Sequence, residues 1–314
     1  MTPAISMSGV TKQYRSVAAL DGLTLDVPAG SIFGFLGPNG AGKTTALKIL
    51  AGLTRATAGH ASVNGVPVDV QGGHRAHVGY LAQDPQFYGW MSGRQVIEYV
   101  ASFYRARTDR GRIDELLELV GITDAADRRT STYSGGMRQR LGIAQALAGD
   151  PAVLLLDEPA AALDPLGRRD VLQLMERLRG TTTIFYSTHI LDDVQRVSDH
   201  VAIVDHGRVV VSAPTAELMH RSAGDTIRVS LVGASDATTG DLARLPGVAA
   251  VTAAGRDGDE WHFQITVDED QTLAVQGAVM RYAVATDLIV ANNRREALDL
   301  EAVFLSIVSK ERAA

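Results

Sequence analysis

A glycine-rich run at residues 37–44 is the feature that most constrains how this 314-residue chain can fold. It reads GPNGAGKT and matches the pattern G-x-x-x-x-G-K-[ST] in full. It follows an apolar stretch, residues 31–36, that we predict to be a strand, and it precedes a helical pattern over residues 43–51. In this context the glycines let successive backbone N–H groups point at phosphate oxygens, at the positive end of a helix. A chance glycine-rich turn would lack these flanks, so the sequence predicts a site for a nucleoside triphosphate.

The phosphate loop and a pair of carboxylates supply the candidate chemistry. We expect Lys43 to reach the β- and γ-phosphates and the hydroxyl of Thr44 to ligate Mg²⁺. The apolar run at residues 152–156 ends in Asp157 and Glu158, and a carboxylate at the end of such a strand can hold Mg²⁺ opposite the loop. Adjacent side chains on a strand point in different directions, so one carboxylate can serve the metal and the other a water molecule. The remaining loop residues that we expect to contact the nucleotide are Gly37, Asn39, Gly40, Ala41, Gly42 and Thr45.

Composition and charge exclude several classes of protein. Hydrophobic residues make up 46% of the chain and charged residues 21%, which is the balance of an ordinary folded protein rather than a disordered one. The net charge of −6 lacks the basic excess of a general nucleic-acid binder, so we expect no nucleic-acid partner. The sequence contains no Cys, which excludes disulfides, thiolate metal sites and a Cys nucleophile.

Signal peptides and membrane spans leave patterns that we do not find in this sequence. Residues 1–10 have neither a basic start nor an apolar core. The longest apolar candidate, residues 273–291, is interrupted by Gln276, Arg281 and Asp287, and charges near the centre of a span cost about 2.5–3.5 kcal/mol each. We therefore predict a helix of a soluble domain there and a cytosolic chain, so that any work at a membrane requires a second polypeptide to supply the span.

The pattern of elements predicts two domains, at residues 1–219 and 220–314. Over residues 3–218, short apolar runs alternate with helical patterns, which is typical of an α/β domain with a buried sheet. Beyond this region, two alternating runs predict half-buried strands, and two helical patterns complete a small α+β domain. The strand runs are 227–231 and 263–267, and the helical patterns are 271–282 and 298–308. Residues 221–314 carry 9 basic and 14 acidic side chains, so this domain holds most of the net negative charge.

A third motif, YSGGMRQR at residues 133–140, identifies a family resemblance. Together with the phosphate loop and three further motifs, it stands in the order found in the ATP-binding subunits of ABC transporters. Those motifs are VLLLDEP at 153–159, ALD at 162–164 and STH at 187–189. The resemblance covers residues 3–218. It implies a P-loop NTPase fold, an ABC ATPase with a RecA-like core, a helical signature subdomain and an antiparallel β-subdomain, followed by the small C-terminal α+β domain.

Finer features resemble one branch of this family, the multidrug and antibiotic-resistance proteins. These features are the YSGGM form of the signature, the phrase GYLAQDPQFY at residues 79–88 and the string LEAVFLSIV at residues 300–308. Members of this branch work with a separate integral membrane protein, an ABC-2 type permease. The resemblance therefore implies ATP hydrolysis that energises export of a drug-like, antibiotic or lipid-like substrate, at the cytoplasmic face of the cell membrane.

The resemblance also assigns roles to residues around the phosphate loop. Tyr14 is similar to the aromatic residue that stacks on adenine, and Gln83 matches the glutamine that contacts Mg²⁺ and the attacking water. His189 resembles the switch histidine that contacts the γ-phosphate. Glu158 and Gln83 would orient a water molecule for in-line attack, while Lys43, Mg²⁺ and the loop amides stabilise the developing charge.

A further set of residues implies a site shared between two copies of the chain. Ser134, Gly135 and Gly136 look like the signature that completes the nucleotide site of a second subunit, by the same helix-terminus physics as the phosphate loop. Asp164 resembles the residue that couples the two sites across the dimer. A loop and a signature in one chain cannot meet the same nucleotide, so two copies would sandwich two ATP molecules head to tail.

The segment after Gln83 predicts a contact with the permease. It contains Phe87, Tyr88, Trp90 and Met91, which we expect to offer an aromatic patch to a cytoplasmic helix of that partner. The acidic second domain does not suit an anionic membrane surface. We therefore expect it to face protein, where it would cap the dimer or regulate hydrolysis.

Two other functions stay open at this point. One is a soluble ABC-type ATPase of translation or DNA repair, and the other is a nucleotide-sensing regulatory subunit with little turnover. The chain has a single cassette, and the segment between Lys43 and Ser134 is short and free of heptads, which disfavours the soluble ATPase. A basal ATPase assay would separate a regulatory subunit from a transport ATPase.

Overall fold

The computed structural model describes residues 2–104, 110–161, 163–222, 226–268 and 271–295. The chain divides into two compact units, residues 1–215 and 216–314. The boundary expected after residue 219 lies inside helix α7 (Thr215–Ser222). The helical pattern at 298–308, the string at 300–308 and residue 162 of the ALD motif lie outside the described residues.

A six-stranded sheet forms the centre of the first unit, in the order β10-β9-β3-β8-β7-β6. Its strands are β3 (Ile32–Leu36), β6 (Val78–Leu81), β7 (Val153–Asp157), β8 (Thr183–Thr188), β9 (His200–Asp205) and β10 (Arg208–Pro214). Neighbouring strands are parallel except β9 and β10, which pair antiparallel. Every residue of β3, β7 and β8 is buried, which explains the near-continuous apolar sequences of β3 and β7. The register pairs Leu36 with Thr188 and Asp157 with Ser187, so the carboxyl ends of these three strands meet at one edge.

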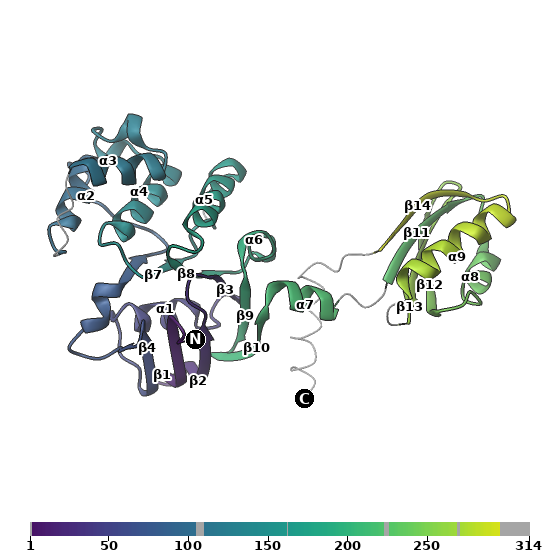
Figure 1. The fold of residues 1–314 in the computed structure, drawn as a ribbon, viewed down its shortest axis with the longest axis horizontal. Coiled ribbons are helices and arrows are strands. Elements are labelled where there is room, and N and C mark those ends of the chain that lie inside the picture. Colours follow the sequence, from purple (N-terminus) through teal and green to yellow (C-terminus); the bar gives the residue numbers. More distant parts are fainter. Residues whose placement is uncertain (1, 105–109, 162, 223–225, 269–270, 296–314) are drawn as a thin grey trace. The chain divides into compact units, whose positions relative to one another are not determined.

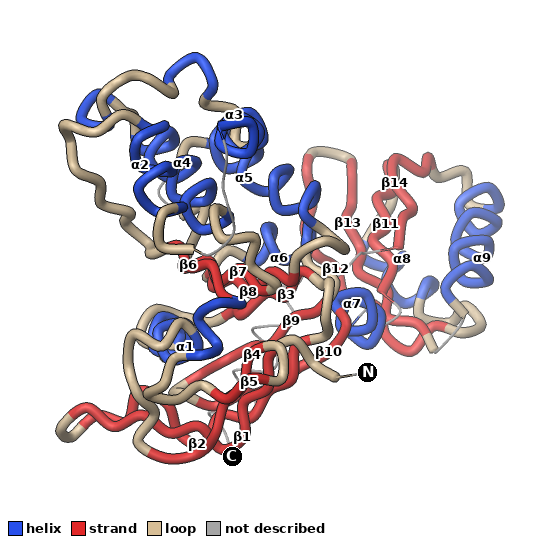
Figure 2. Tube along the Cα trace, turned by 60° about the vertical axis from the view of Figure 1, so that its left-hand side comes forward, coloured by secondary structure: helices blue, strands red, loops and turns tan. Residues whose placement is uncertain are grey.

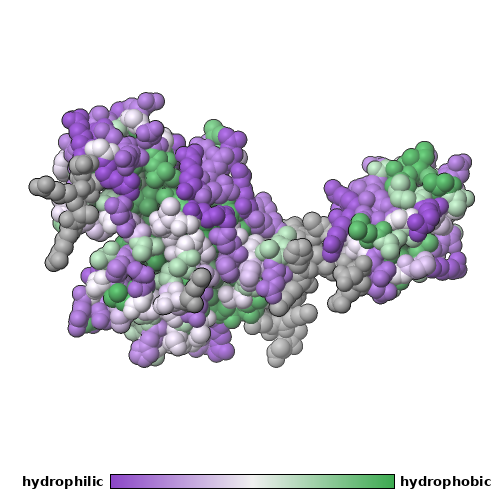
Figure 3. All heavy atoms as spheres, viewed as in Figure 1, coloured by the Kyte–Doolittle hydropathy of each residue, from purple (hydrophilic) through white to green (hydrophobic). Residues whose placement is uncertain are grey.

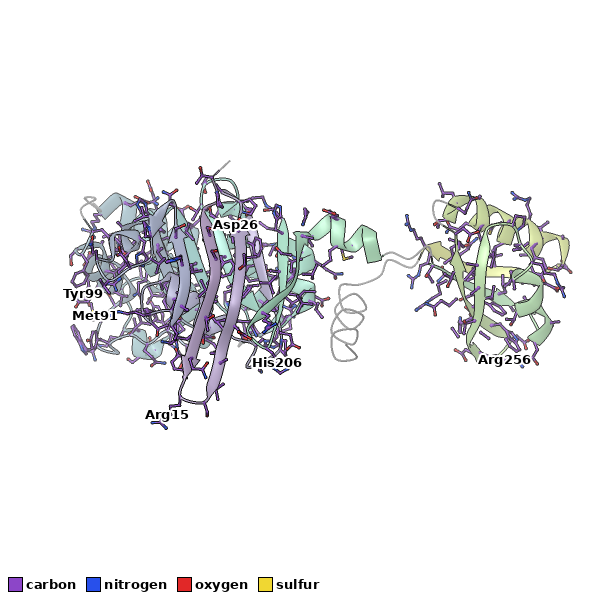
Figure 4. All side chains as sticks on the ribbon, turned by 90° about the horizontal axis from the view of Figure 1, so that it is seen from below. Arg15, Asp26, Met91, Tyr99, His206 and Arg256 are labelled. Atoms are coloured by element: carbon purple, nitrogen blue, oxygen red, sulfur yellow. The ribbon has the colours of Figure 1, made fainter. Side chains whose placement is uncertain are left out.

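A four-stranded antiparallel sheet, in the order β2-β1-β4-β5, accompanies the central sheet in this unit. Its strands are β1 (Ile5–Tyr14), β2 (Val17–Val27), β4 (Ala58–Val63) and β5 (Val66–Pro67). Strands β1 and β2 form a long hairpin, and Figure 4 shows Arg15 at its tip, projecting from the unit. One cluster of buried apolar side chains joins both sheets to helix α1 (Lys43–Leu50), with Met7, Leu47 and Phe35 among its members. Figures 1 and 2 show α1 beside the strands of both sheets. The strand before the phosphate loop and the helix after it are thus both packed into this apolar cluster.

Helices gather at the other end of the first unit, where they carry the signature motif (Figure 1). The helices at this end are α2 (Gly93–Ala101), α3 (Arg110–Leu119) and α4 (Gly135–Leu147). Helix α5 (Pro165–Leu178) follows β7, and α6 (Leu191–Val197) packs against α5 and against β3 and β8 of the central sheet. Among the described residues, short 3₁₀ helices are η1 (Gly73–His77), between β5 and β6, and η2 (Thr123–Ala125) and η3 (Thr130–Thr132), between α3 and α4. Helices α2, α3 and α4 pack against one another and form the helical subdomain that the family resemblance implies. Helix α2 begins with a capping box between Ser92 and Gln95, which fixes where this subdomain starts.

The second unit contains a four-stranded antiparallel sheet in the order β12-β13-β11-β14. After α7 its elements are β11 (Thr226–Val232), α8 (Asp236–Leu242), β12 (Val248–Asp257), β13 (Glu260–Val267), α9 (Thr272–Ala285) and β14 (Ile289–Arg295). Leu242 of α8 and Val275 and Val279 of α9 share one core with the apolar residues of β11 and β13, so both helices cover the same face of the sheet. The strands expected at 227–231 and 263–267 and the helix expected at 271–282 are confirmed.

The single helix expected over residues 273–291 is wrong. Helix α9 ends at Ala285, the chain turns at Asp287 with φ of 55°, and strand β14 begins at Ile289. Apolar residues continue past Asp287, but this second part of the stretch packs as an edge strand beside β11. Among the described residues, no helix is long and apolar enough to cross a membrane.

Candidate functional site

The phosphate loop has a backbone that only glycine allows at its critical positions. Gly42 precedes α1 with φ of 100°, in the left-handed region, and a Cβ there would stand 2.3 Å from the carbonyl oxygen of Ala19. A Cβ on Gly37 would stand 2.3 Å from the carbonyl oxygen of Val204. The loop therefore lies against β2 on one side and β9 on the other, which fixes the direction of the amides at the start of α1.

Lys43 lies inside this loop and is almost fully buried. Its Nζ donates to the carbonyl oxygens of Gly37 at 2.8 Å and Pro38 at 3.0 Å, and it lies 3.6 Å from Oε1 of Glu158. Burial lowers the pKa of Lys43, and the negative charge of Glu158 opposes that shift. The ammonium group is thus held by two neutral carbonyl oxygens and lies near one carboxylate. Phosphate oxygens can replace the two carbonyl oxygens as its acceptors.

Asp157 and Thr44 form a pair of oxygen donors at the carboxyl edge of the sheet. The Thr44 hydroxyl donates to Oδ1 of Asp157 at 3.0 Å, and the Ser187 hydroxyl donates to the same oxygen at 2.7 Å. A hydroxyl and a carboxylate are the hard oxygen ligands that Mg²⁺ prefers, and the two residues therefore fit this ion. In the part of the chain that the structure describes, no group of three or more His, Cys, Asp or Glu could hold a metal. Besides this pair, an ion would have the amide oxygen of Gln83, phosphate and water as further oxygen donors.

Glu158 is the centre of a cluster of polar side chains. Its Oε2 accepts from Nε2 of Gln83 at 3.4 Å, and its Oε1 lies 3.3 Å from Nδ1 of His189. Its backbone has φ of 47°, a conformation that non-glycine residues rarely adopt and that often marks functional sites. The structure therefore brings together Lys43, Gln83, Glu158 and His189, which the sequence places far apart.

A pocket of about 350 Å³ opens in front of these residues. Its lining is Ala19, Asn39, Gly40, Gly42, Lys43, Thr44, Thr45, Gln83 and Glu158. Gly37 and Ala41 belong to the loop but are buried, and they do not line this pocket. Tyr14 lies outside the lining, at the end of β1, where its ring is 46% exposed and Nζ of Lys12 lies 4.8 Å from the ring centroid.

The signature residues and Asp164 lie outside this pocket and begin two helices. The Ser134 hydroxyl caps α4 by accepting from the backbone N–H of Met137 at 3.2 Å, and Gly135 beside it is exposed. The Asp164 carboxylate caps α5 by accepting from the N–H of Gly167 at 2.8 Å. Both caps stabilise their helices and leave the helix N-termini open to a further anion or partner.

The expected aromatic patch is partly wrong. Tyr88 and Trp90 are 63% and 69% exposed, with ring centroids 5.8 Å apart, whereas Met91 is 8% exposed and belongs to the core. A second exposed pair that the sequence analysis did not identify consists of Tyr99 on α2 and Phe103, with ring centroids 5.0 Å apart. Figure 4 shows Tyr99 and Met91 at the same end of the first unit.

Comparison with known proteins decides the family. The sequence profile of the ABC transporter family matches residues 20–161. The daunorubicin/doxorubicin resistance ATP-binding protein DrrA of Streptomyces peucetius is 35% identical over 272 residues, which cover 85% of this chain and 82% of DrrA. The ABC transporter ATP-binding protein YxlF of Bacillus subtilis is 37% identical over 250 residues, which cover 79% of this chain and 82% of YxlF. The chain belongs to the ABC transporter ATP-binding proteins.

Solved structures of ABC ATPases have the same fold. The cassette MJ0796, as a dimer in a post-hydrolysis state with ADP and Pi, has a TM-score of 0.62 at 25% identity and covers 67% of this chain and 98% of its own. CbiO1 of Clostridium perfringens, part of the ABC transporter complex cbiONQ, has a TM-score of 0.64 at 28% identity. The match covers 70% of this chain and 92% of CbiO1. The predicted fold, the resemblance to the resistance branch and the ATPase activity are confirmed.

Ser187 is a residue of this ABC ATPase whose contribution the sequence analysis missed. Its hydroxyl donates to Asp157 and accepts from the backbone N–H of Glu158 at 2.9 Å, and the residue is fully buried. It thereby holds the carboxylate of Asp157 and the backbone of Glu158 at the end of β7. The available signal was a polar residue at the end of a buried strand, but its partner depends on the pairing of β8 with β7.

We expect the Ser187→Ala variant to be about 1–3 kcal/mol less stable, because a buried N–H and a buried carboxylate oxygen would each lose a partner. Urea unfolding followed by far-UV circular dichroism measures this loss. Ser212→Ala, at an exposed position of β10, is the matched control and should leave the free energy of unfolding unchanged. Equal stability of the two variants would contradict the role of Ser187.

Proposed function

We propose that this ABC ATPase acts as a head-to-tail homodimer that hydrolyses MgATP and drives a separate ABC-2 type permease. The observation that carries the proposal is the separation within one chain, where the phosphate loop lines the pocket and the signature does not. A second copy can supply the missing donors to the nucleotide. The resistance proteins among the relatives favour a drug-like, antibiotic or lipid-like substrate, exported from the cytoplasmic face of the membrane.

The residues around Glu158 support a mechanism for hydrolysis. The carboxylate of Glu158 and the amide of Gln83 would hold a water molecule in line with the γ-phosphate, and His189 would contact that phosphate. Lys43 would exchange its carbonyl acceptors for phosphate oxygens. Thr44 and Asp157 would hold Mg²⁺, which neutralises phosphate charge when bound. Catalysis would thus consist of positioning and electrostatic stabilisation.

The helix N-terminus at Ser134 supports the part that a second copy would play. Exposed glycine backbone follows the Ser134 cap, so amides at the start of α4 are accessible to the γ-phosphate of a nucleotide bound by another chain. Asp164 would lie at the junction of the two sites. Binding of ATP would close the dimer and hydrolysis would let it open, which is the motion that a permease needs to change access.

The adenine ring would stack on Tyr14, whose exposed ring lies at the end of β1. Since base stacking on an aromatic ring contributes about 1–3 kcal/mol, Tyr14→Ala should weaken ATP binding about 5- to 100-fold. Titration with a fluorescent ATP analogue measures the dissociation constant. Tyr14→Phe keeps the ring and should bind as the unaltered chain does. The same affinity in Tyr14→Ala would remove Tyr14 from the site.

The exposed ring pair of Tyr88 and Trp90 would contact a cytoplasmic helix of the permease. An affinity-tagged chain extracted from its own membranes with mild detergent should retain one integral membrane protein, identified by mass spectrometry. The double variant Tyr88→Ser, Trp90→Ser should lose that protein while its basal ATPase rate stays unchanged. Recovery of soluble partners alone would contradict the transport function.

The second unit would contact protein rather than lipid, in line with its acidic charge. Helix α9 presents Leu273 and Val284, which are 84% and 81% exposed, on the side away from the sheet. Figure 3 shows hydrophobic side chains gathered on this unit. Such a patch is typical of an interaction surface. Removal of residues 221–314, followed by measurement of dimer mass and ATPase rate, tests this role, and no change in either would contradict it.

A further inference from the structure

The side chain of Lys12 lies against the ring of Tyr14, two residues further along β1. Its Nζ stands over the ring at 4.8 Å from the centroid, which is within the range of a cation–π contact. Residues two apart on a strand point to the same face of the sheet, which places the two side chains next to each other. The ring is 46% exposed, so one of its faces is covered by an ammonium group and a ligand can stack only on the other.

The ammonium group of Lys12 is itself fixed by a second segment of the chain, residues 51–57 between α1 and β4. Its Nζ donates to the carbonyl oxygen of Arg55 at 2.7 Å. The backbone N–H of Thr57 donates to the carbonyl oxygen of Thr11 at 2.7 Å, and the N–H of Gln13 donates to the hydroxyl of Thr57 at 3.0 Å. These two bonds flank Lys12 along β1. The position of the ammonium group is therefore determined by bonds between two segments rather than by its own flexible stem.

The β1–β2 hairpin places the Tyr14 ring beside the nucleotide pocket. Tyr14 pairs in register with Val17 of β2, and Ala19, two residues further along β2, lines the pocket. Two residues of a strand span about 7 Å. The ring thus lies on the hairpin that supplies one wall of the pocket, just beyond that wall, where the base of a nucleotide held by the phosphate loop would lie under the proposed function.

The contact between Lys12 and Tyr14 has the right size to prepare the ring for a base. Immobilising a side chain on binding costs about 0.5–1.5 kcal/mol, and a cation–π contact at an exposed site contributes about 0.5–1 kcal/mol. Both faces of an aromatic ring carry partial negative charge, which disfavours direct face-to-face stacking with another ring. The positive charge of Lys12 on one face offsets this repulsion on the other. Both effects therefore favour stacking of a base on the open face of Tyr14.

We propose that Lys12 is a positioning residue for the adenine base of ATP. Its ammonium group, fixed on the carbonyl oxygen of Arg55, holds one face of the Tyr14 ring so that the opposite face is ordered before the nucleotide binds. This inference rests on the proposed stacking of adenine on Tyr14. Lys12 acts through that ring and does not contact the phosphates, which the residues of the phosphate loop hold.

The Lys12→Met variant of the full-length chain tests this role, because it keeps the apolar stem and removes the charge. Its affinity for a non-hydrolysable ATP analogue, measured by calorimetric titration, should fall about 2- to 5-fold. Its affinity for inorganic tripolyphosphate, which has no base, should stay unchanged. Lys12→Arg keeps a cation over the ring and should bind the analogue as the unaltered chain does. Gln13→Met is the matched control, since this neighbour bonds the carbonyl oxygen of Arg15 instead of the ring.

Steady-state kinetics give a second readout of the same role. Stacking of the base is equally strong in the ground state and in the transition state, so Lys12→Met should raise KM for ATP by the same 2- to 5-fold factor and leave kcat unchanged. A fall in kcat with unchanged KM would contradict the proposal, because it would place Lys12 in the chemical step.

A double-mutant cycle with Tyr14 separates positioning from a merely structural role. In a chain that carries Tyr14→Ala, Lys12→Met should have no further effect on ATP affinity, because the ring is gone. An equal loss in both backgrounds would overturn the proposal, in favour of support for the segment at Arg55. Weaker binding of tripolyphosphate would overturn it in favour of a direct phosphate contact.

The same cycle distinguishes this inference from the proposed function on which it rests. Unchanged ATP affinity in Lys12→Met, together with weakened binding in Tyr14→Ala, would overturn the role of Lys12 and leave the stacking on Tyr14 in place. Unchanged affinity in Tyr14→Ala would remove both.

Discussion

ATP turnover should fall at least about 100-fold when Glu158 is replaced by Gln, because general base catalysis typically contributes at least this factor. The substitution keeps the shape of the side chain and its contact with Gln83, but it removes the negative charge that faces Lys43. ATP binding should therefore persist, and an ATP-bound dimer should accumulate. Steady-state phosphate release measures turnover, and light scattering after size exclusion measures the mass of the complex.

The control for this experiment is Glu176→Gln, which changes an exposed carboxylate on α5 that does not line the pocket. Its turnover and its mass in MgATP should match those of the unaltered chain. Near-normal turnover in Glu158→Gln would remove Glu158 from its proposed role. Loss of ATP binding in that variant would show that Glu158 supports the loop rather than the attacking water.

The second large effect concerns Lys43. Replacing it by Ala should weaken ATP binding about 10- to 100-fold, because hydrogen bonds to a charged group contribute about 1.5–3 kcal/mol. It also leaves the buried carboxylate of Glu158 without its neighbouring cation, so hydrolysis should be lost even at saturating ATP. Calorimetric titration with a non-hydrolysable ATP analogue measures the affinity, and phosphate release at high ATP measures the turnover.

Lys48 offers a matched control on the same helix. It is exposed in the last turn of α1, and Lys48→Ala should change neither affinity nor turnover. If the two lysine variants bind ATP equally well, the phosphate loop does not use its lysine as proposed. A thermal unfolding scan of each variant separates loss of binding from loss of fold.

The sequence was sufficient to predict those parts of the site whose residues lie within one contiguous motif. The phosphate loop is one contiguous run with glycines at fixed spacing. Its place between strand β3 and helix α1 therefore follows from the sequence motif. Asp157 and Glu158 were identifiable because the carboxyl ends of parallel strands meet at one edge. The cap at Ser134 lies where the signature motif predicts a helix to begin, whereas the cap at Asp164 emerges only from the structure.

The sequence was insufficient where strand register or packing determines which residues meet and which are buried. Ser187 reaches Asp157 because β8 pairs with β7, and Arg228 meets Arg294 because β14 returns beside β11. Neighbouring residues of similar character can differ in burial, as Met91 and Trp90 do, because only one of them faces the helical core. These contacts join residues far apart along the chain, and no local pattern encodes them.

The central claim is that a nucleotide lies between the phosphate loop of one copy and the signature of another. A crystal structure of the Glu158→Gln variant grown with MgATP tests it most directly. The account predicts two copies around two ATP molecules, each γ-phosphate held by Lys43 of one copy and the serine hydroxyl at position 134 of the other. A nucleotide bound by a single copy, with Ser134 facing solvent, would contradict it.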